Sequence, residues 1–243
     1  MAKERIDVVL TEQGLAPSRE KAKALIMAGE IYIGHERITK PDMKVALDAV
    51  IEIRKNPIPY VGYGGVKLEK AIDDFHIDLK GKKAIDIGSS TGGFVDYLLK
   101  SGISLVYAVD AGTHQLHESF RNNPGVVVKE NFNARYLGFD DIGEKVDVIT
   151  IDVSFISLKK ILPVIPPLLN PGGKVVSLVK PQFEVGRFEV GKGGIVKDIG
   201  KIERVMEDIK TFGHSLGLQC IGTVEAPREK EKKNREFFLL WEM

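Results

Sequence analysis

The sequence has few of the features that mark secreted, disulfide-bonded or membrane proteins. Its single cysteine, Cys220, cannot form an intramolecular disulfide and lacks the paired spacing of a structural zinc site, and the five histidines are dispersed. No stretch approaches the ~18 consecutive apolar residues of a membrane-spanning helix, and no apolar signal segment follows the charged start at residues 1–5. We therefore expect a cytoplasmic protein with no membrane association and no metal.

The chain also lacks a strong net charge. It carries 35 Lys and Arg against 34 Asp and Glu, for a net charge of +1. Since neutralisation of phosphates dominates nucleic-acid affinity, an RNA-binding surface here has to come from segregated charge. The 43% of hydrophobic residues excludes a disordered class, and 243 residues suffice for about two domains.

A segment rich in proline and glycine divides the chain. Residues 54–65 contain two prolines and three glycines, which interrupt both helical and strand periodicity. The predicted organisation is a first domain at 1–58, a linker at 59–66 and a second domain at 67–243.

The first domain carries basic residues along one predicted helix, which begins at the N-cap Ser18 and stops at Gly29. A solvated helix face is the ordinary explanation for such a run. The helix start at residues 18–19, its ending at residues 28–34 and the following pair at residues 40–41 nevertheless resemble the S-four domain. This small RNA-binding module is shared by a ribosomal protein, pseudouridine synthases and a tRNA synthetase. The resemblance implies RNA contacts by Arg19, Lys21, Lys23 and Lys40.

The second domain alternates strand and helix signals. Helices are expected from residue 91, from residue 113, over 158–168 and over 198–215. Between and after them, strand signals occur at 83–87, 104–109, 126–128, 146–151, 174–179, 219–224 and 237–242. Such alternation predicts a parallel, doubly wound α/β sheet.

The first strand of this domain leads into a glycine-rich turn at residues 86–93. Glycines let the backbone approach a ligand closely. A dinucleotide fingerprint needs Gly-x-Gly-x-x-Gly for pyrophosphate. Here Asp86 takes the place of the first glycine, where its charge repels pyrophosphate and suits the ammonium group of S-adenosyl-L-methionine, which we predict as the cofactor. The predicted contacts in and after the turn are Asp86, Gly88, Ser90, Thr91, Gly92, Gly93 and Phe94.

Polar residues after later strands complete the predicted cofactor site. Asp110 ends the second strand about 20 residues beyond the turn, where a carboxylate accepts hydrogen bonds from ribose hydroxyls. Asn131 follows the third strand, where the adenine edge is expected, and Asp152 follows the fourth. A capping or turn role is the alternative for each of these residues.

Four charged residues are predicted to meet at the same edge of the sheet. Asp152, Lys180 and Glu236 stand at the tips of predicted strands. Lys67 starts the helix before the first strand and can reach over that edge. Lys180 is the candidate base, although an ordinary lysine, with a pKa of about 10.4, has to lose its proton first. A solvated ion-pair network is the alternative.

Six separated motifs occur in an order that resembles the TlyA family of ribosomal RNA 2′-O-methyltransferases, also known as haemolysin A. They are the S-four-like start and residues 60–68, 86–94, 152–158, 180–184 and 191–196. The resemblance implies an FtsJ-like catalytic half, a Rossmann-like sheet whose last strand runs antiparallel beside the fifth, with a Lys-Asp-Lys-Glu tetrad. It also implies S-adenosylmethionine as methyl donor and cytidine of ribosomal RNA, within a ribosomal subunit, as target. The tetrad falls on Lys67, Asp152, Lys180 and Glu236.

A glycine-bearing loop at residues 183–194 contains Phe-Glu-Val-Gly twice. Arg187 and Lys192 are expected to meet RNA phosphates as this loop closes, with an ordinary surface loop as the alternative. Three other functions stay open: an RNA-binding assembly factor with an inactive methyltransferase fold, a haemolysin, and a small-molecule methyltransferase. The complete tetrad argues against the first, the lack of a membrane span against the second and the S-four module against the third.

Overall fold

The computed structural model describes residues 3–54, 58–186, 189–229 and 233–243 of a chain that forms two compact units. The units are residues 1–59 and 60–243, so the division lies one residue beyond the predicted end of the first domain. Helix α3 (Tyr63–Phe75) begins inside the segment expected to be a linker. The glycines there serve close packing, because a Cβ added to Gly65 would lie 2.3 Å from the ring of Tyr60.

The first unit packs two helices, α1 (Ile6–Glu12) and α2 (Arg19–Met27), against short strands. The predicted start of α2 is confirmed, since Ser18 Oγ accepts a hydrogen bond from the backbone N–H of Lys21 at 3.2 Å. Strand β1 pairs with β4, and β2 lies between β3 and β5. The strands are β1 (Lys3–Arg5), β2 (Ile31–Ile33), β3 (Glu36–Arg37), β4 (Lys44–Ala46) and β5 (Ile51–Ile53).

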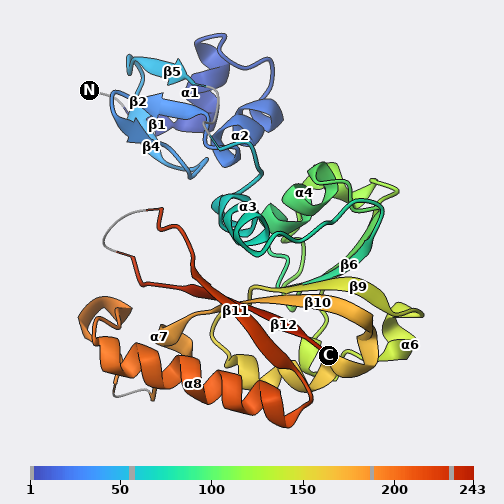
Figure 1. The fold of residues 1–243 in the computed structure, drawn as a ribbon. Helices are drawn as coiled ribbons and strands as arrows, with labels where there is room; N and C mark the ends of the chain where they lie inside the picture. The colour runs from blue at the N-terminus through green and yellow to red at the C-terminus, as the bar shows by residue number, and fades with distance from the viewer. Residues whose placement is uncertain (1–2, 55–57, 187–188, 230–232) are drawn as a thin grey trace. The chain divides into compact units, whose positions relative to one another are not determined.

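A seven-stranded sheet of order β11-β12-β10-β9-β6-β7-β8 forms the centre of the second unit (Figure 1). β12 runs antiparallel to both neighbours, and the other neighbouring strands are parallel. The predicted doubly wound sheet with one antiparallel strand is therefore confirmed. Its strands are β6 (Lys83–Ile87), β7 (Leu105–Val109), β8 (Val126–Lys129), β9 (Val146–Ile151), β10 (Leu169–Val179), β11 (Gln219–Glu225) and β12 (Phe237–Glu242).

The insertion of β12 determines where the site lies. Phe237, the first residue of β12, stands opposite Val179, the last residue of β10. Since β9 and β10 run parallel, the residues that follow them and the residue that precedes β12 all emerge at one edge of the sheet.

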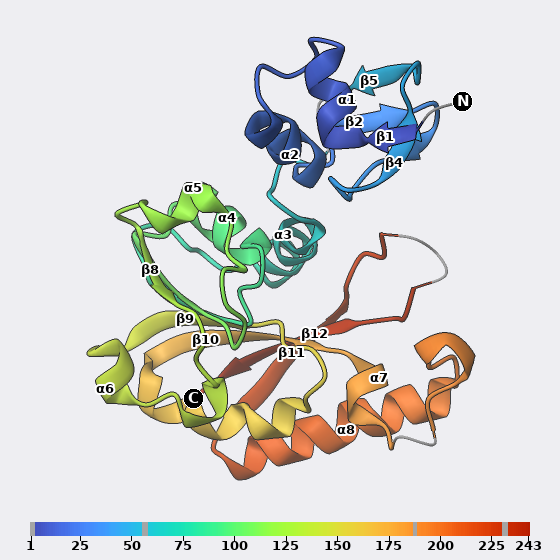
Figure 2. The same ribbon diagram turned by 180° about the vertical axis from the view of Figure 1, so that it is seen from behind.

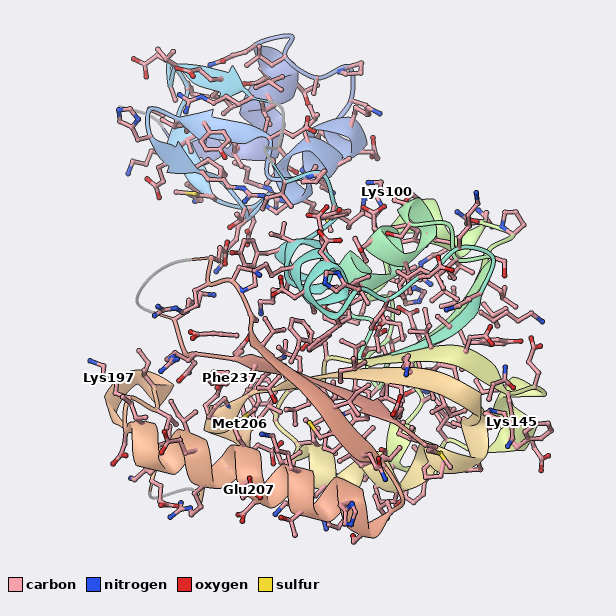
Figure 3. The ribbon with its side chains drawn as sticks, viewed as in Figure 1. Lys100, Lys145, Lys197, Met206, Glu207 and Phe237 are labelled. Atoms are coloured by element: carbon pink, nitrogen blue, oxygen red, sulfur yellow. The ribbon has the colours of Figure 1, made fainter. Side chains whose placement is uncertain are left out.

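Helices cover both faces of this sheet (Figures 1 and 2). α3, α4 (Gly93–Lys100) and α5 (Glu118–Arg121) lie on one face, and α6 (Phe139–Ile142), α7 (Pro181–Glu184) and α8 (Ile199–Ser215) on the other. Along α8, Met206 is buried and Glu207 is exposed (Figure 3), as the amphipathic pattern of this segment requires.

The prediction of a helix over residues 158–168 is wrong. The segment forms three short 3₁₀ turns, because Pro163, Pro166 and Pro167 remove backbone donors that an α-helix would use. These turns are Leu158–Lys160, Leu162–Val164 and Pro166–Leu168, and two further 3₁₀ turns span Ala134–Tyr136 and Lys192–Gly194. Among the described residues, no helix has the length and apolar content needed to cross a membrane.

Candidate active site

A cavity of about 580 Å³ opens beyond the ends of β6, β7 and β9. Its size falls in the range of small-molecule binding sites. Of the described residues, the only charged side chains that line it are Asp110 and Asp152, and no lysine or arginine takes part. The cavity therefore favours a cationic ligand over a polyphosphate. The lining residues are Ile87, Gly88, Ser90, Val109, Asp110, Ala111, Gly112, Gln115, Asn133, Ala134, Asp152, Val153, Ser154, Phe155, Ile156 and Ile161.

The glycine turn and the β7 end are held together by Asp110. Its two carboxylate oxygens accept the backbone N–H groups of Ser90 at 2.8 Å and Gly112 at 2.6 Å. Gly88 has a φ of 87°, and a Cβ there would lie 2.4 Å from the carbonyl oxygen of Asp152. A side chain at this position would push the turn away from β9, so glycine keeps the cavity in its present shape.

The structure separates the residues predicted to bind the cofactor into two groups. Gly88, Ser90, Asp110 and Asp152 line the cavity. The other predicted residues do not line it. Thr91 is exposed, and Asn131 has a φ of 54°, so that Asn133 lines the cavity in its place. The remaining residues that do not line it are buried, namely Asp86, Gly92, Gly93 and Phe94.

The buried glycines and Phe94 have packing roles. A Cβ on Gly92 would lie 2.7 Å from the ring of Phe120, and one on Gly93 would lie 3.1 Å from the backbone nitrogen of Gly65. Phe94 packs against Phe238, with ring centroids 6.1 Å apart. These three positions set how closely α4 approaches its neighbours.

Asp86 lies fully buried beneath the turn. Thr150 Oγ1 donates a hydrogen bond to Asp86 Oδ1 at 2.7 Å, and Oδ2 has no hydrogen-bond partner among the described residues. Burial raises the pKa of Asp86 to about 7; the Thr150 hydrogen bond opposes this rise, and the charges of Asp152 and Asp110 add to it. A cation bound in the cavity above would favour the ionised form of this carboxyl.

The four residues of the predicted tetrad meet at the sheet edge as two ion pairs. Lys67 Nζ donates to Glu236 Oε2 at 2.6 Å. Lys180 Nζ lies 2.5 Å from Asp152 Oδ1. All four side chains are at least four-fifths buried, which strengthens both pairs relative to surface ion pairs.

A second cavity, of about 300 Å³, is lined by three of the tetrad residues. Asp152 lines both this cavity and the larger one, so the two cavities adjoin at this residue. The smaller cavity is lined by Tyr63, Gly64, Lys67, Asp152, Gln182, Ala226, Pro227, Arg228, Glu229, Lys233, Asn234 and Glu236. A substrate group there would lie next to a ligand of the larger cavity.

Two loops carry the Asp152–Lys180 pair, and side chains bind these loops to each other. Lys180 Nζ donates to Ser154 Oγ at 2.9 Å. Glu184 accepts hydrogen bonds from Ser157 Oγ at 2.5 Å and from the backbone N–H of Leu158 at 2.7 Å, and burial raises the pKa of Glu184. These bonds fix the segment after β9 against α7, so the pair is held from both sides.

Phe155 stands out at the lip of the larger cavity. Its φ is 63°, its side chain is 90% exposed, and its ring packs on Phe183 with centroids 4.9 Å apart. A left-handed backbone at a bulky residue is rare and clusters at functional sites. The sequence offered no signal for this exposure, since a phenylalanine after a buried strand is usually taken for a core residue.

The residues predicted to bind RNA lie in both units. Arg19 is half-exposed, and Nη2 donates at 3.0 Å to the buried carboxylate of Asp7. Lys21 and Lys40 are exposed, and Lys23 is partly buried. Arg187 lies outside the described residues, and Lys192 lies in the 3₁₀ turn of the glycine-bearing loop. No group of three or more metal-binding side chains occurs in the part of the chain that the structure describes.

Comparison with known proteins places the chain in a family. A family model described as FtsJ-like methyltransferase matches residues 60–243, and one described as S4 domain matches residues 4–51. The chain belongs to the FtsJ-like methyltransferase family. Its S4 domain precedes the methyltransferase domain, in the order that the sequence motifs predicted.

Relatives of this FtsJ-like methyltransferase match nearly its full length. Bacillus subtilis YqxC is 47% identical, over 98% of this chain and 85% of YqxC. The 16S/23S rRNA (cytidine-2'-O)-methyltransferase TlyA of Mycobacterium tuberculosis is 39% identical, over 97% of this chain and 88% of TlyA. The solved structure of a candidate hemolysin from Streptococcus thermophilus is 41% identical with a TM-score of 0.76, covering 100% of this chain and 89% of that one. The resemblance to the TlyA family is confirmed.

Proposed function

We propose that this FtsJ-like methyltransferase transfers a methyl group from S-adenosyl-L-methionine to a ribose 2′-hydroxyl of cytidine in ribosomal RNA. The observation that carries the proposal is the meeting of two lysine–carboxylate pairs at a cavity that adjoins a larger, acidic one. The relative TlyA is named for the same reaction. Because ribosomal RNA is the proposed substrate, a ribosomal subunit is the proposed partner and the cytoplasm the proposed location.

The residues of the larger cavity fit the proposed cofactor. Asp110 and Asp152 give this cavity a negative charge, and apolar walls such as Val109 and Ile156 suit an adenosyl group. We propose that Asp110 binds the ribose of the cofactor and that Asp152 binds its cationic end. When bound there, S-adenosylmethionine supplies a methyl group activated by its sulfonium charge.

The smaller cavity is the proposed place of the target ribose. Its Lys67–Glu236 pair and the Asp152–Lys180 pair are positioned to orient a hydroxyl beside the larger cavity. Orientation of the hydroxyl contributes more to the rate enhancement than removal of its proton does. A ribose hydroxyl is a weak nucleophile that has to align with the bond being broken. We propose that Lys180 is the base that accepts the hydroxyl proton, for which its amine has to be neutral.

Phe155 is the proposed platform for a base of the RNA. An exposed ring held by Phe183 at the cavity lip offers a flat surface on which a nucleobase can stack. Neither an RNA-binding assembly factor nor a haemolysin requires two buried lysine–carboxylate pairs beside an acidic cavity, so we do not favour these alternatives.

The experiment that tests this function compares Lys180→Ala with Lys145→Ala on purified ribosomal subunits and radiolabelled cofactor. Lys145 is exposed and lies outside both cavities, so its variant is a matched control (Figure 3). Lys180→Ala should lose at least about 100-fold in methyl transfer and keep cofactor affinity within about twofold by titration calorimetry. Full activity of Lys180→Ala, or no transfer by the wild-type protein, would refute the proposal.

A further inference from the structure

The side chain of Gln182 contacts one ion pair of the site, and its backbone follows the lysine of the other. Its Nε2 donates to Glu236 Oε1 at 3.3 Å, while Lys67 holds the other oxygen of the same carboxylate. Gln182 lies in the first turn of α7, whose N-cap is Lys180. One short segment therefore carries a member of the Asp152–Lys180 pair and a group that holds Glu236.

The orientation of the Gln182 amide follows from its neighbour. An ionised carboxylate only accepts hydrogen bonds, so the amide nitrogen has to face Glu236 and the oxygen has to face away from it. That oxygen, Oε1, is buried and has no hydrogen-bond partner among the residues that the structure describes.

An unpaired buried acceptor lowers stability. An apolar side chain of similar volume would remove this cost, because it needs no partner. Local features that oppose stability are expected mainly where function requires them. A glutamine at this position is therefore explained by its bond to Glu236 rather than by the packing of α7.

We propose that Gln182 is a positioning residue for methyl transfer, an inference that rests on the proposed function. It holds the Glu236 carboxylate so that Lys67 and Glu236 face the same cavity as Asp152, the partner of Lys180. Without it, Lys67 is the one remaining partner of the Glu236 carboxylate among the described residues, so the carboxylate can rotate and the alignment of the two pairs is lost.

The first test replaces Gln182 with leucine in the full-length protein. Methyl transfer to ribosomal subunits, cofactor binding by calorimetry and thermal unfolding are measured together. Gln182→Leu should lower kcat at least about tenfold, keep KM for the subunit and Kd for the cofactor within about twofold, and leave the thermal midpoint unchanged or higher. Gln219→Leu changes an exposed glutamine on β11, so it is a matched control with unchanged kinetics.

The second test uses Gln182→Glu and a pH profile. When the new carboxyl group at position 182 is ionised, it repels Glu236. When the new group is protonated, it donates a hydrogen bond to Glu236 as the amide does. The activity of this variant relative to wild type should therefore rise as the pH falls from about 8 to about 6. Other charged groups at this cavity are common to both proteins, so the ratio isolates position 182: Lys67, Asp152, Arg228, Glu229, Lys233 and Glu236.

These outcomes separate the inference from the function on which it rests. An inactive wild-type protein would overturn both. An active wild type together with a Gln182→Leu variant of equal kcat would overturn only the inference. So would a Gln182→Leu variant that loses kcat and thermal stability together, or a flat pH ratio for Gln182→Glu.

Discussion

Replacing Asp86 with asparagine should make the stability of the second unit less sensitive to pH. The native carboxyl is fully buried beneath the glycine turn, and burial raises its pKa from 3.8 to about 7. The raised value means that folding favours the protonated form. The stability this group contributes is complete below about pH 4 and is lost as the pH rises through about 7.

The size of the effect follows from the same values. Stability falls by about 1.4 kcal/mol per pH unit while the native carboxyl is protonated and the unfolded one is ionised. Between about pH 5 and the native pKa of about 7 this amounts to as much as about 3 kcal/mol. Asparagine has no proton to lose, and it keeps an oxygen that can accept the Thr150 hydrogen bond.

Urea unfolding at about pH 5 and about pH 8 measures the effect. The single tryptophan, Trp241, is fully buried in β12 and bonds to Ser177 Oγ at 2.8 Å, so its fluorescence reports on the second unit. Asp86→Asn should gain stability relative to wild type as the pH rises, by up to about 3 kcal/mol. The exposed Asp140, changed to asparagine, is the control. An equal difference between Asp86→Asn and wild type at both pH values would refute the buried, protonated carboxyl.

Two further variants test packing and RNA contact. Gly65→Ala should destabilise the second unit by about 1–3 kcal/mol in Trp241-monitored unfolding, because the new methyl group would meet the Tyr60 ring. Gly200→Ala should leave the stability unchanged, because the nearest atom to the new Cβ would lie 3.4 Å away. Equal effects of the two changes would contradict the packing described for α3. Phe155→Ala should weaken binding of ribosomal RNA about tenfold in a filter-binding assay with cofactor affinity unchanged, whereas unchanged RNA binding would rule out the stacking platform.

Strand positions made the tetrad predictable from the sequence. Asp152 and Lys180 follow apolar runs that become parallel neighbours, and parallel strands end at one edge. Placing Glu236 there needed the insertion of β12, which the family resemblance implied and the sheet order confirms. Which lysine pairs with which carboxylate depends on side-chain reach across the edge, and no sequence pattern encodes that.

Loop geometry limited the remaining predictions. Asn133 rather than Asn131 lines the cavity, because the chain turns through a positive φ at Asn131. The exposure of Phe155 also depends on a positive φ, and the role of Gln182 depends on a contact with a residue 54 positions away. Such contacts arise from tertiary packing, so local patterns do not reveal them. The prolines of the 158–168 segment did carry a readable signal against an α-helix.

The central claim is that two lysine–carboxylate pairs direct a methyl group to a ribose oxygen. Mass spectrometry of nucleosides from ribosomal subunits treated with cofactor and either wild-type protein or Lys180→Ala tests it most directly. The account predicts 2′-O-methylcytidine with the wild-type protein and none with Lys180→Ala. A methyl group on a base atom, or the same 2′-O-methylated nucleoside from both proteins, would contradict it.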